Sequence, residues 1–151
     1  MTIRPMTAND VEQVAALTSE LGYPSNADQI SRRLARIVGQ PHQMIYVAED
    51  AGMAVAWLHV AVHAYLESDA FAEILGLVVG ERHRGRGIGH ALVTTAEEWA
   101  GANGCRIIRV RSRVSRERAH AFYERGGFRR VKTQHCFEKT NSLLTQPPVT
   151  E

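Results

Sequence analysis

The chain has few of the residues that mark disulfide-bonded, metal-binding or membrane proteins. Among its 151 residues there are two cysteines, Cys105 and Cys136, whose separation matches no metal-binding spacing. We therefore expect two buried thiols in a reducing cytoplasm, and no bound metal. No stretch approaches the roughly 18 apolar residues of a membrane-spanning helix. The first residues lack the apolar region of a secretory signal, so neither feature is expected.

What the chain does contain is typical of a globular protein. Hydrophobic residues make up 44% of the sequence and charged residues 23%, which is the usual composition of soluble domains. A chain of this length can bury a core of its own. We expect one domain over residues 1–138 and a flexible tail over residues 139–151, which include two consecutive prolines.

Charge is distributed unevenly along the chain. Residues 82–130 hold 12 arginines and four acidic residues, a net charge of +8, whereas the other residues hold six basic and 12 acidic residues, a net charge of −6. The basic region suits an anionic cofactor, and the acidic remainder suits a cationic amine. Aromatic residues that could stack on bases do not interleave with the arginines, so a nucleic acid is not the expected partner.

A basic, glycine-rich segment follows an apolar run in the middle of the chain. It reads Leu77-Val78-Val79-Gly80-Glu81-Arg82-His83-Arg84-Gly85-Arg86-Gly87-Ile88-Gly89-His90. The pattern predicts a strand, a loop and the start of a helix, whose unpaired N–H groups can bind phosphate. Glycine lets the backbone approach an anion closely because it has no Cβ. We therefore predict a site for a phosphorylated cofactor.

The spacing of the glycines narrows the choice of cofactor. The segment does not contain G-x-G-x-x-G, the dinucleotide pattern, and it lacks the lysine of a P-loop. It does contain R-x-x-G-x-G, from Arg84 to Gly89, directly after the predicted strand. This signature resembles the pyrophosphate loop of the GNAT superfamily, the acetyl-CoA-dependent N-acetyltransferases.

A second segment carries the same resemblance. Residues 119–128, Ala-His-Ala-Phe-Tyr-Glu-Arg-Gly-Gly-Phe, are similar to the GNAT pattern A-x-x-[FL]-Y-x-x-x-G-[FY], which closes the cofactor cleft in that family. Together with Leu-Gly-Tyr-Pro at residues 21–24, this segment resembles a small-molecule branch of the superfamily. That branch includes aminoglycoside and aminoalkylphosphonate acetyltransferase-like proteins.

Hydrophobic periodicity predicts an α/β fold. Strands are expected at residues 3–5, 43–50, 53–65, 71–79 and 106–114 and within 128–137, and helices after Thr7 or Asn9, after Ser25 or Asn26, at 88–102 and at 115–125. The order is β-α-α-β-β-β-α-β-α-β. It indicates a mixed α/β sheet with helices on its faces. The order is similar to that of the GNAT superfamily, and this resemblance implies a GNAT-type mixed, mostly antiparallel central sheet with helices on both faces.

The resemblance also implies which residues bind acetyl-CoA. Backbone groups of Leu77, Val78 and Val79 would bind the acetyl and pantetheine part, with the N–H of Val78 or Val79 polarising the acetyl carbonyl. The residues around the pyrophosphate would be Arg84, Gly85, Arg86, Gly87, Ile88, Gly89 and His90. Many relatives carry asparagine where this chain has Arg116. A contact of Arg116 to a phosphate or an anionic substrate group is one alternative, and a solvated arginine is the other.

Two residues are expected to move protons. The resemblance implies that Tyr123 protonates the departing thiolate. An alkylammonium with a pKa of about 10.4 is only about 0.1% neutral at pH 7, so its attack on a thioester needs a base. Glu73 is the preferred base, because it lies on the strand that leads to the acetyl site, where many relatives carry an acid. The alternatives are His59, His63 and Glu67.

The acceptor is expected to be a small molecule with a primary amine, which attacks acetyl-CoA directly in a ternary complex. Tyr23, Trp57, His59 and Tyr65 are expected to line its pocket, since period two places residues 57, 59, 63 and 65 on one face. Acetylation of a protein N-terminus or lysine, or of an aminoacyl-tRNA, and a non-catalytic acyl-CoA sensor are the alternatives. We expect a cytoplasmic protein that forms a homodimer and binds neither nucleic acid nor a membrane.

Overall fold

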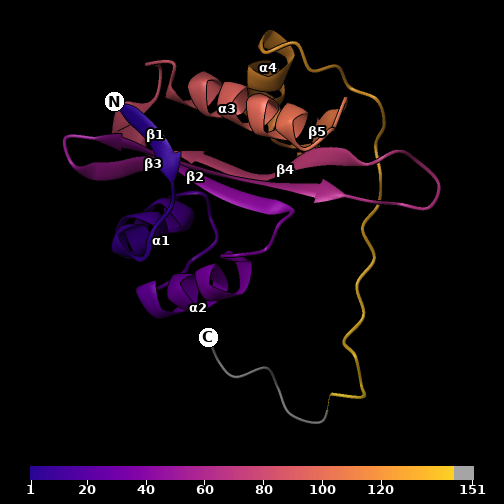
Figure 1. The fold of residues 1–151 in the computed structure, drawn as a ribbon, viewed down its shortest axis with the longest axis horizontal. Helices are drawn as coiled ribbons and strands as arrows, with labels where there is room; N and C mark the ends of the chain where they lie inside the picture. Colours follow the sequence, from indigo (N-terminus) through magenta and orange to yellow (C-terminus); the bar gives the residue numbers. More distant parts are fainter. Residues whose placement is uncertain (145–151) are drawn as a thin grey trace. The chain divides into compact units, whose positions relative to one another are not determined.

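The computed structural model describes residues 1–144. Contacts divide the chain into one unit over Met1–Arg111 and a second that begins at Ser112. The first unit contains a five-stranded sheet in the order β1-β2-β3-β4-β5 (Figure 1). The strands are β1 (Thr2–Pro5), β2 (Gln43–Asp50), β3 (Met53–His63), β4 (Phe71–Val79) and β5 (Ile108–Val110).

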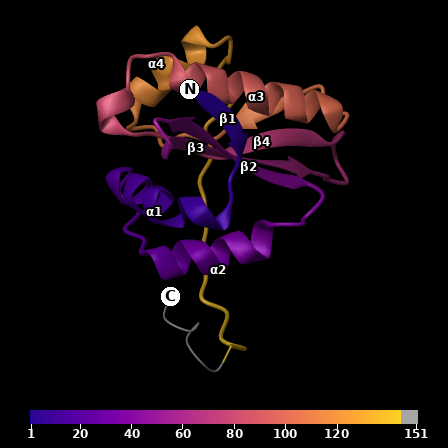
Figure 2. The ribbon, with the colours of Figure 1, turned by 60° about the vertical axis from the view of Figure 1, so that its left-hand side comes forward.

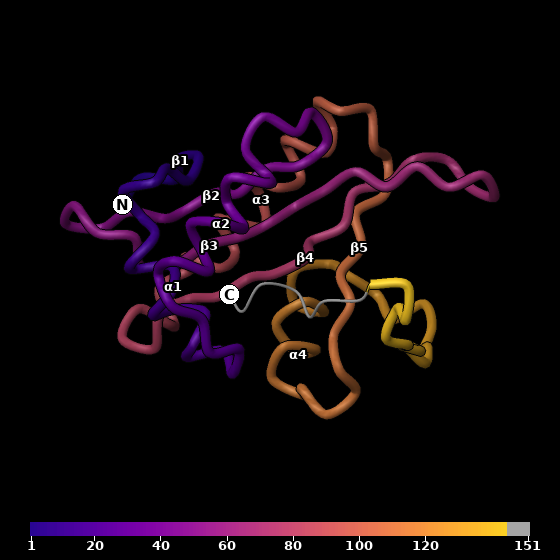
Figure 3. The backbone as a smooth tube through the Cα atoms, turned by 90° about the horizontal axis from the view of Figure 1, so that it is seen from below, coloured from indigo at the N-terminus to yellow at the C-terminus, as the bar shows by residue number. Residues whose placement is uncertain are grey.

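The sheet is mixed and mostly antiparallel, as predicted. The pairs from β1 to β4 are antiparallel, and β5 pairs parallel with β4. From the side of α1 and α2, the strands run next to one another (Figure 3). The turn between β2 and β3 has Ala51 and Gly52 at φ of 49° and 79°. Positive φ at both central residues matches the right-handed twist of the two strands.

Helices cover both faces of this sheet (Figure 2). The short 3-10 helix η1 (Ala8–Asp10), α1 (Val11–Glu20) and α2 (Ala27–Ile37) lie on one side, and α3 (Ile88–Ala102) packs against β3 and β4 on the other. Thr7 and Asn26 begin the first two helical segments, because each accepts a hydrogen bond from a backbone N–H of the first turn. Within the described residues, none of the helices has the length and apolar character to cross a membrane.

A buried cluster joins α1 and α2 to the sheet. It includes Val14 of α1, Ile30 and Leu34 of α2, and Val47 of β2, with Trp57 packed against it. Burial of such side chains supplies most of the stability of an amphipathic helix on a sheet. On the other face, α3 buries its apolar side around Leu92, which is fully buried.

An ion-pair network ties β1 to the helices on this side. The two carboxylate oxygens of Asp10 each accept a 2.8 Å hydrogen bond from the Arg4 guanidinium, and one of them also accepts from the N–H of Thr7. Arg4 donates a further bond to Glu49 at 2.9 Å. Asp10 is 3% exposed, and these bonds from Arg4 hold the pKa of its carboxyl below the ordinary value.

The second unit differs from the prediction after its helix. Helix α4 (Glu117–Arg125) begins two residues later than predicted, and no strand follows it within the described residues. The strand predicted within 128–137 does not form, because its apolar side chains find no sheet to cover: Val131 is 62% exposed and Phe137 93% exposed. Residues 145–151 of the predicted tail lie outside the described residues.

Three smaller predictions also need correction. The strand predicted at 106–114 is confined to β5, and residues 111–114 beyond it are exposed. Cys105 is buried as expected, but Cys136 is exposed, because it lies in the segment that forms no strand. Strand β3 ends at His63, so Tyr65 lies in the turn beyond the strand rather than on its face.

Candidate functional site

The glycine loop between β4 and α3 has a conformation that depends on glycine. After the 3-10 turn η2 (Glu81–His83), Gly85 and Gly87 have φ of 79° and 81°. Side-chain-bearing residues rarely adopt this left-handed region. A Cβ built at either glycine would have no neighbouring atom within 4 Å. The two glycines are therefore required by the course of the backbone, and the surface over them is open.

The loop delivers the start of a long helix whose first N–H groups receive no hydrogen bond from a capping side chain. Gly87 is the N-terminal cap of α3, supplies no side chain, and accepts the first helical hydrogen bond from Ala91 at 3.0 Å. The N–H groups of Gly89 and His90 thus have no acceptor within the helix. No acidic side chain lies in the first turn, while Arg84 and Arg86 are exposed beside it. The arrangement fits a diphosphate, whose charge the helix dipole and arginines would stabilise.

Strand β4 has an open edge just before this loop. Its pairing with β5 covers Ala72 to Ile74 and stops there within the described residues. Gly80 donates its N–H to Val55 of β3, and alternation along the strand then turns the N–H of Val78 toward β3 and that of Val79 toward the open edge. The Arg84 side chain donates to the carbonyl of Val79 at 3.2 Å. Leu77 and Val79 therefore offer main-chain groups to an extended, amide-containing ligand.

A bulge in β4 decides which side chains share a face. The register with β3 shifts between His59 and Val60, and Leu75 is left without a partner. Because of this extra residue, Glu73, Gly76 and Val78 lie opposite Ala61, His59 and Trp57 and on the same side of the sheet. That side is covered by α1 and α2. The bulge thus brings Glu73 to the face that carries Trp57 and His59.

Glu73 is a buried carboxylate with two cationic or titratable partners. It is 4% exposed, and its oxygens lie 2.7 Å from Nε2 of His63 and 2.9 Å from Nε of Arg111. An ionised carboxylate has about four acceptor positions, so Glu73 can still accept from a further donor. His63 stacks on Tyr65, with ring centroids 5.8 Å apart. Glu67, the third alternative base, lies exposed in the turn after β3.

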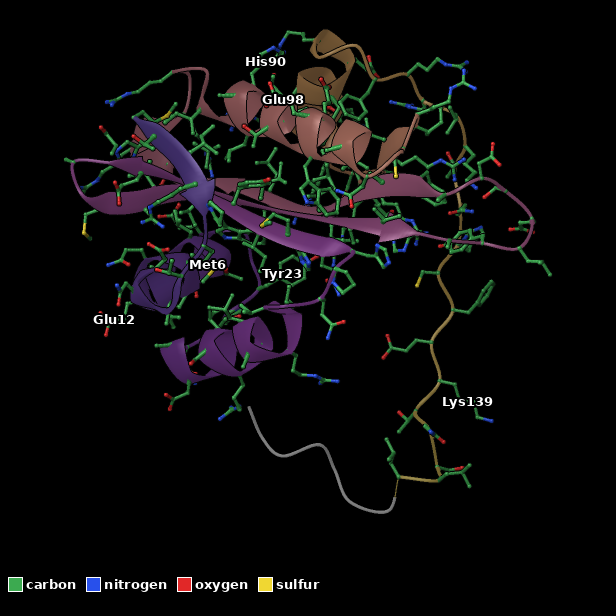
Figure 4. All side chains as sticks on the ribbon, in the orientation of Figure 1. Met6, Glu12, Tyr23, His90, Glu98 and Lys139 are labelled. Carbon is green, nitrogen blue, oxygen red and sulfur yellow. The ribbon has the colours of Figure 1, made fainter. Side chains whose placement is uncertain are left out.

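Trp57 and His59 line a partly open cavity of about 160 Å³ between the sheet and the helices α1 and α2. Met6 contributes to the lining from the connection after β1 (Figure 4). Burial lowers the pKa of His59, so its imidazole is neutral at pH 7. Its Nε2 lies 2.8 Å from Oε1 of Gln43, an oxygen that accepts, so Nε2 carries the proton.

The other two predicted pocket residues do not line this cavity. Tyr23 is 48% exposed in the connection after α1, and Tyr65 is 42% exposed in the turn after β3. Sequence reasoning found Trp57 and His59 from the period of the strand. It could not find the apolar lining from α2, because apolar residues at helical spacing also form ordinary core.

Helix α4 of the second unit contains most residues of the second sequence motif, including Tyr123. The ring of Tyr123 lies 5.1 Å from that of Phe122 and 5.5 Å from that of Phe128. The N–H of Phe128 donates to the carbonyl of Tyr123 at 3.0 Å, across a turn in which Gly127 has φ of 92°. Burial raises the pKa of Tyr123 to about 12, which the charge of Arg116 partly opposes. The phenol is therefore protonated throughout the neutral range.

Arg111 was not among the predicted site residues. Arg109, Arg111 and Arg113 occupy alternate positions of the strand predicted at 106–114. In the structure, Arg109 lies over the ring of Phe71 at 4.2 Å from its centroid, and Arg111 contacts Glu73. The sequence did contain an indication of this contact, because a buried strand carboxylate needs a cationic partner and the next strand is rich in arginine.

Comparison with known proteins agrees with this geometry. Residues 11–128 match the acetyltransferase (GNAT) family. The chain is 26% identical to an aminoglycoside N(6')-acetyltransferase type 1 of Klebsiella aerogenes, over 91% of this chain and 95% of that protein. It is 28% identical to an aminoalkylphosphonate N-acetyltransferase of Salmonella typhimurium, over 93% and 90% of the two chains.

The fold is also similar to that of solved structures. A crystal structure of the aminoglycoside N-acetyltransferase AAC(6')-Iy in complex with CoA superimposes with a TM-score of 0.83, at 19% identity, over 93% of this chain and 95% of that chain. At this identity the likeness shows a shared fold, not a shared substrate.

Proposed function

Because the chain belongs to the acetyltransferase (GNAT) family, we propose that it transfers acetyl from acetyl-CoA to the primary amine of a small molecule, by direct attack in a ternary complex. The observation that carries this proposal is the order of groups along β4 and into α3. Buried Glu73, the open edge at Leu77 and Val79, and the start of α3, which has no side-chain cap, follow one another on a continuous segment.

The cofactor would be held largely by main-chain groups. The loop from Arg84 to His90 would bind the diphosphate through backbone N–H groups and the two exposed arginines. The open edge of β4 would pair with the amides of the pantetheine arm. The N–H of Val79 would donate to the acetyl oxygen. Bound acetyl-CoA supplies an acetyl group activated as a thioester.

The protons would be handled by residues of both units. Glu73 would accept a proton from the incoming ammonium, directly or through one water, and Arg111 and His63 would hold the carboxylate in place. Tyr123 would donate its phenolic proton to the departing sulfur, and its raised pKa keeps that proton in place at neutral pH. Trp57 and His59 would contact the acceptor.

The named relatives support a small-molecule acceptor, since they act on aminoglycosides and aminoalkylphosphonates. The test is release of free thiol from acetyl-CoA with a panel of polyamines, aminoglycosides, aminophosphonates, arylalkylamines and peptides, with mass spectrometry of the amine. We expect a small amine to be acetylated with matching thiol release. Acetylation of peptides alone would overturn the small-molecule proposal, and cofactor binding without transfer to any amine would indicate a sensor.

A further inference from the structure

The cavity under β3 has the size of a small hydrophobic ligand. Its volume is about 160 Å³, close to that of engineered apolar cavities of about 150 Å³ that bind benzene. It lies between α1, α2 and the strands β2 and β3, and most of its lining is aliphatic, including Val14, Ile30, Leu34 and Ile45. Such a cavity accepts one aromatic or cycloaliphatic ring without any polar compensation.

The polar groups at the cavity are few, and most already have partners. The hydroxyl of Thr18 donates to the carbonyl of Val14 at 2.7 Å, and Arg33 donates to Ser25 at 3.1 Å. His59 is bonded to Gln43. Among the residues that the structure describes, no carboxylate lines the cavity. A polycationic, polyhydroxylated aminoglycoside would therefore find an arginine where it needs acids, and aliphatic carbon where it needs hydrogen bonds.

The indole of Trp57 lines the cavity and packs on β4. Its Nε1–H is buried without a hydrogen bond among the described residues and is not open to the cavity. The outer edge of the same indole covers β4 so closely that a Cβ at position 76 would lie 2.7 Å from its Cη2 and Cζ3 atoms. Trp57 also lies opposite Val78, within the segment that we assign to the acetyl group.

We infer that this cavity receives the body of the acceptor, and that the acceptor is a primary amine on a compact apolar ring. The inference rests on the proposed function and adds the chemical class of the amine. It also gives Gly76 a role, since any larger residue would displace the indole from β4.

The first test is direct binding, measured without acetyl-CoA. Trp99→Phe leaves Trp57 as the single tryptophan of the chain. We expect its fluorescence to respond to 2-phenoxyethylamine and to 3-phenylpropylamine, which differ by an ether oxygen in place of a methylene, and not to the aminoglycoside neamine. Response to neamine alone, or to none of the three, would overturn the inference.

The second test fills the cavity. Val14→Phe adds a ring at a lining position that is 4% exposed, and Val38→Phe makes the same change at a position that is 62% exposed after α2. We expect Val14→Phe to weaken binding of both aryl amines by about tenfold or more, and Val38→Phe to leave it unchanged. Equal affinity in the two variants would contradict the site, provided that both show cooperative thermal unfolding.

A milder variant keeps the test available if Val14→Phe does not fold. Trp57→Phe keeps a ring and removes part of the cavity wall. By calorimetry it should weaken 2-phenoxyethylamine and 3-phenylpropylamine by a similar factor, and unchanged affinity for both would argue against the site. Calorimetry with CoA distinguishes a failure of this inference from a failure of the proposed function. Uptake of CoA without aryl amine binding overturns this inference alone, whereas failure to bind CoA overturns the proposed function.

Discussion

The glycine loop before α3 and the cavity under β3 present opposite chemistry. The loop offers main-chain N–H groups and exposed arginines, and a Cβ at Gly85 or Gly87 would meet no described atom within 4 Å. The cavity offers mostly aliphatic side chains. One is suited to a charged phosphate, and the other to an apolar ring. A transferase with an anionic donor and an apolar acceptor needs this separation.

The two regions also differ in how they are encoded. The loop needs glycine at particular positions. Only glycine readily adopts the backbone conformation found there and lets a ligand approach the backbone closely. The cavity needs only apolar volume from four separate elements, and many sequences provide that. The glycine loop can therefore be predicted from the sequence, whereas the cavity can be found only in the structure.

The largest expected effect lies outside both regions, at Glu73, which is on β4 beyond the residues that pair with Trp57 and His59. Glu73→Gln keeps the shape and removes the charge, and we expect kcat/KM to fall by about 10²- to 10⁴-fold. The loss should shrink as pH rises, because more of the free amine is then already neutral. The measurement is a pH profile of thiol release, with Glu67→Gln, an exposed carboxylate, as the control. A pH-independent loss, or an equal loss in His63→Gln with a normal Glu73, would assign the base elsewhere.

The next prediction tests whether Tyr123 of the second unit acts on acetyl-CoA, the acetyl donor. Tyr123→Phe should lower turnover by about 100-fold while CoA affinity is retained. With a phenol pKa of about 12, the wild-type rate should show no fall from loss of this proton up to about pH 10, where an ordinary tyrosine is half ionised. Stopped assays from pH 7 to 10 measure this. Unchanged turnover in Tyr123→Phe would remove it from the acid role.

A third prediction concerns stability on the cavity side alone. Asp10→Asn should cost about 2 kcal/mol of the free energy of unfolding near pH 7, because the charged bonds to Arg4 are lost. The folded-state pKa of Asp10 lies below its ordinary value of 3.8, so this contribution is present above that value and is lost as pH falls through the folded-state pKa. Urea unfolding at pH 7 and pH 3 should show the difference between the proteins narrowing in acid. A constant difference would contradict it.

The smallest expected effect comes from a substitution in the glycine loop, compared with a matched substitution outside it. Gly87→Ala places a Cβ at φ of 81°, and Gly104→Ala does the same at φ of 77° at the other end of α3. Both should cost about 1–2 kcal/mol in stability from the left-handed backbone. We expect Gly87→Ala alone to weaken CoA, by about tenfold. Equal CoA affinity in the two variants would separate the loop from the cofactor.

Much of the fold could be predicted from sequence, and the reasons are specific. Periodicity placed β4 and α3 at the residues where they occur, because each has a strong pattern and a clear boundary. The strand after α4 was predicted wrongly, since β-favouring residues such as Val131 do not pair without a neighbouring strand. The bulge at Leu75 and the contact of Arg111 with Glu73 depend on register, which sequence alone does not specify here.

Calorimetric titration of acetyl-CoA into the folded wild-type chain, beside Gly87→Ala and Gly104→Ala, tests the central assignment most directly. We predict saturable uptake of one equivalent by the wild type and by Gly104→Ala, weakened in Gly87→Ala. Absence of uptake of both acetyl-CoA and CoA by cooperatively folded protein would contradict the assignment of the loop and of the chemistry built on it.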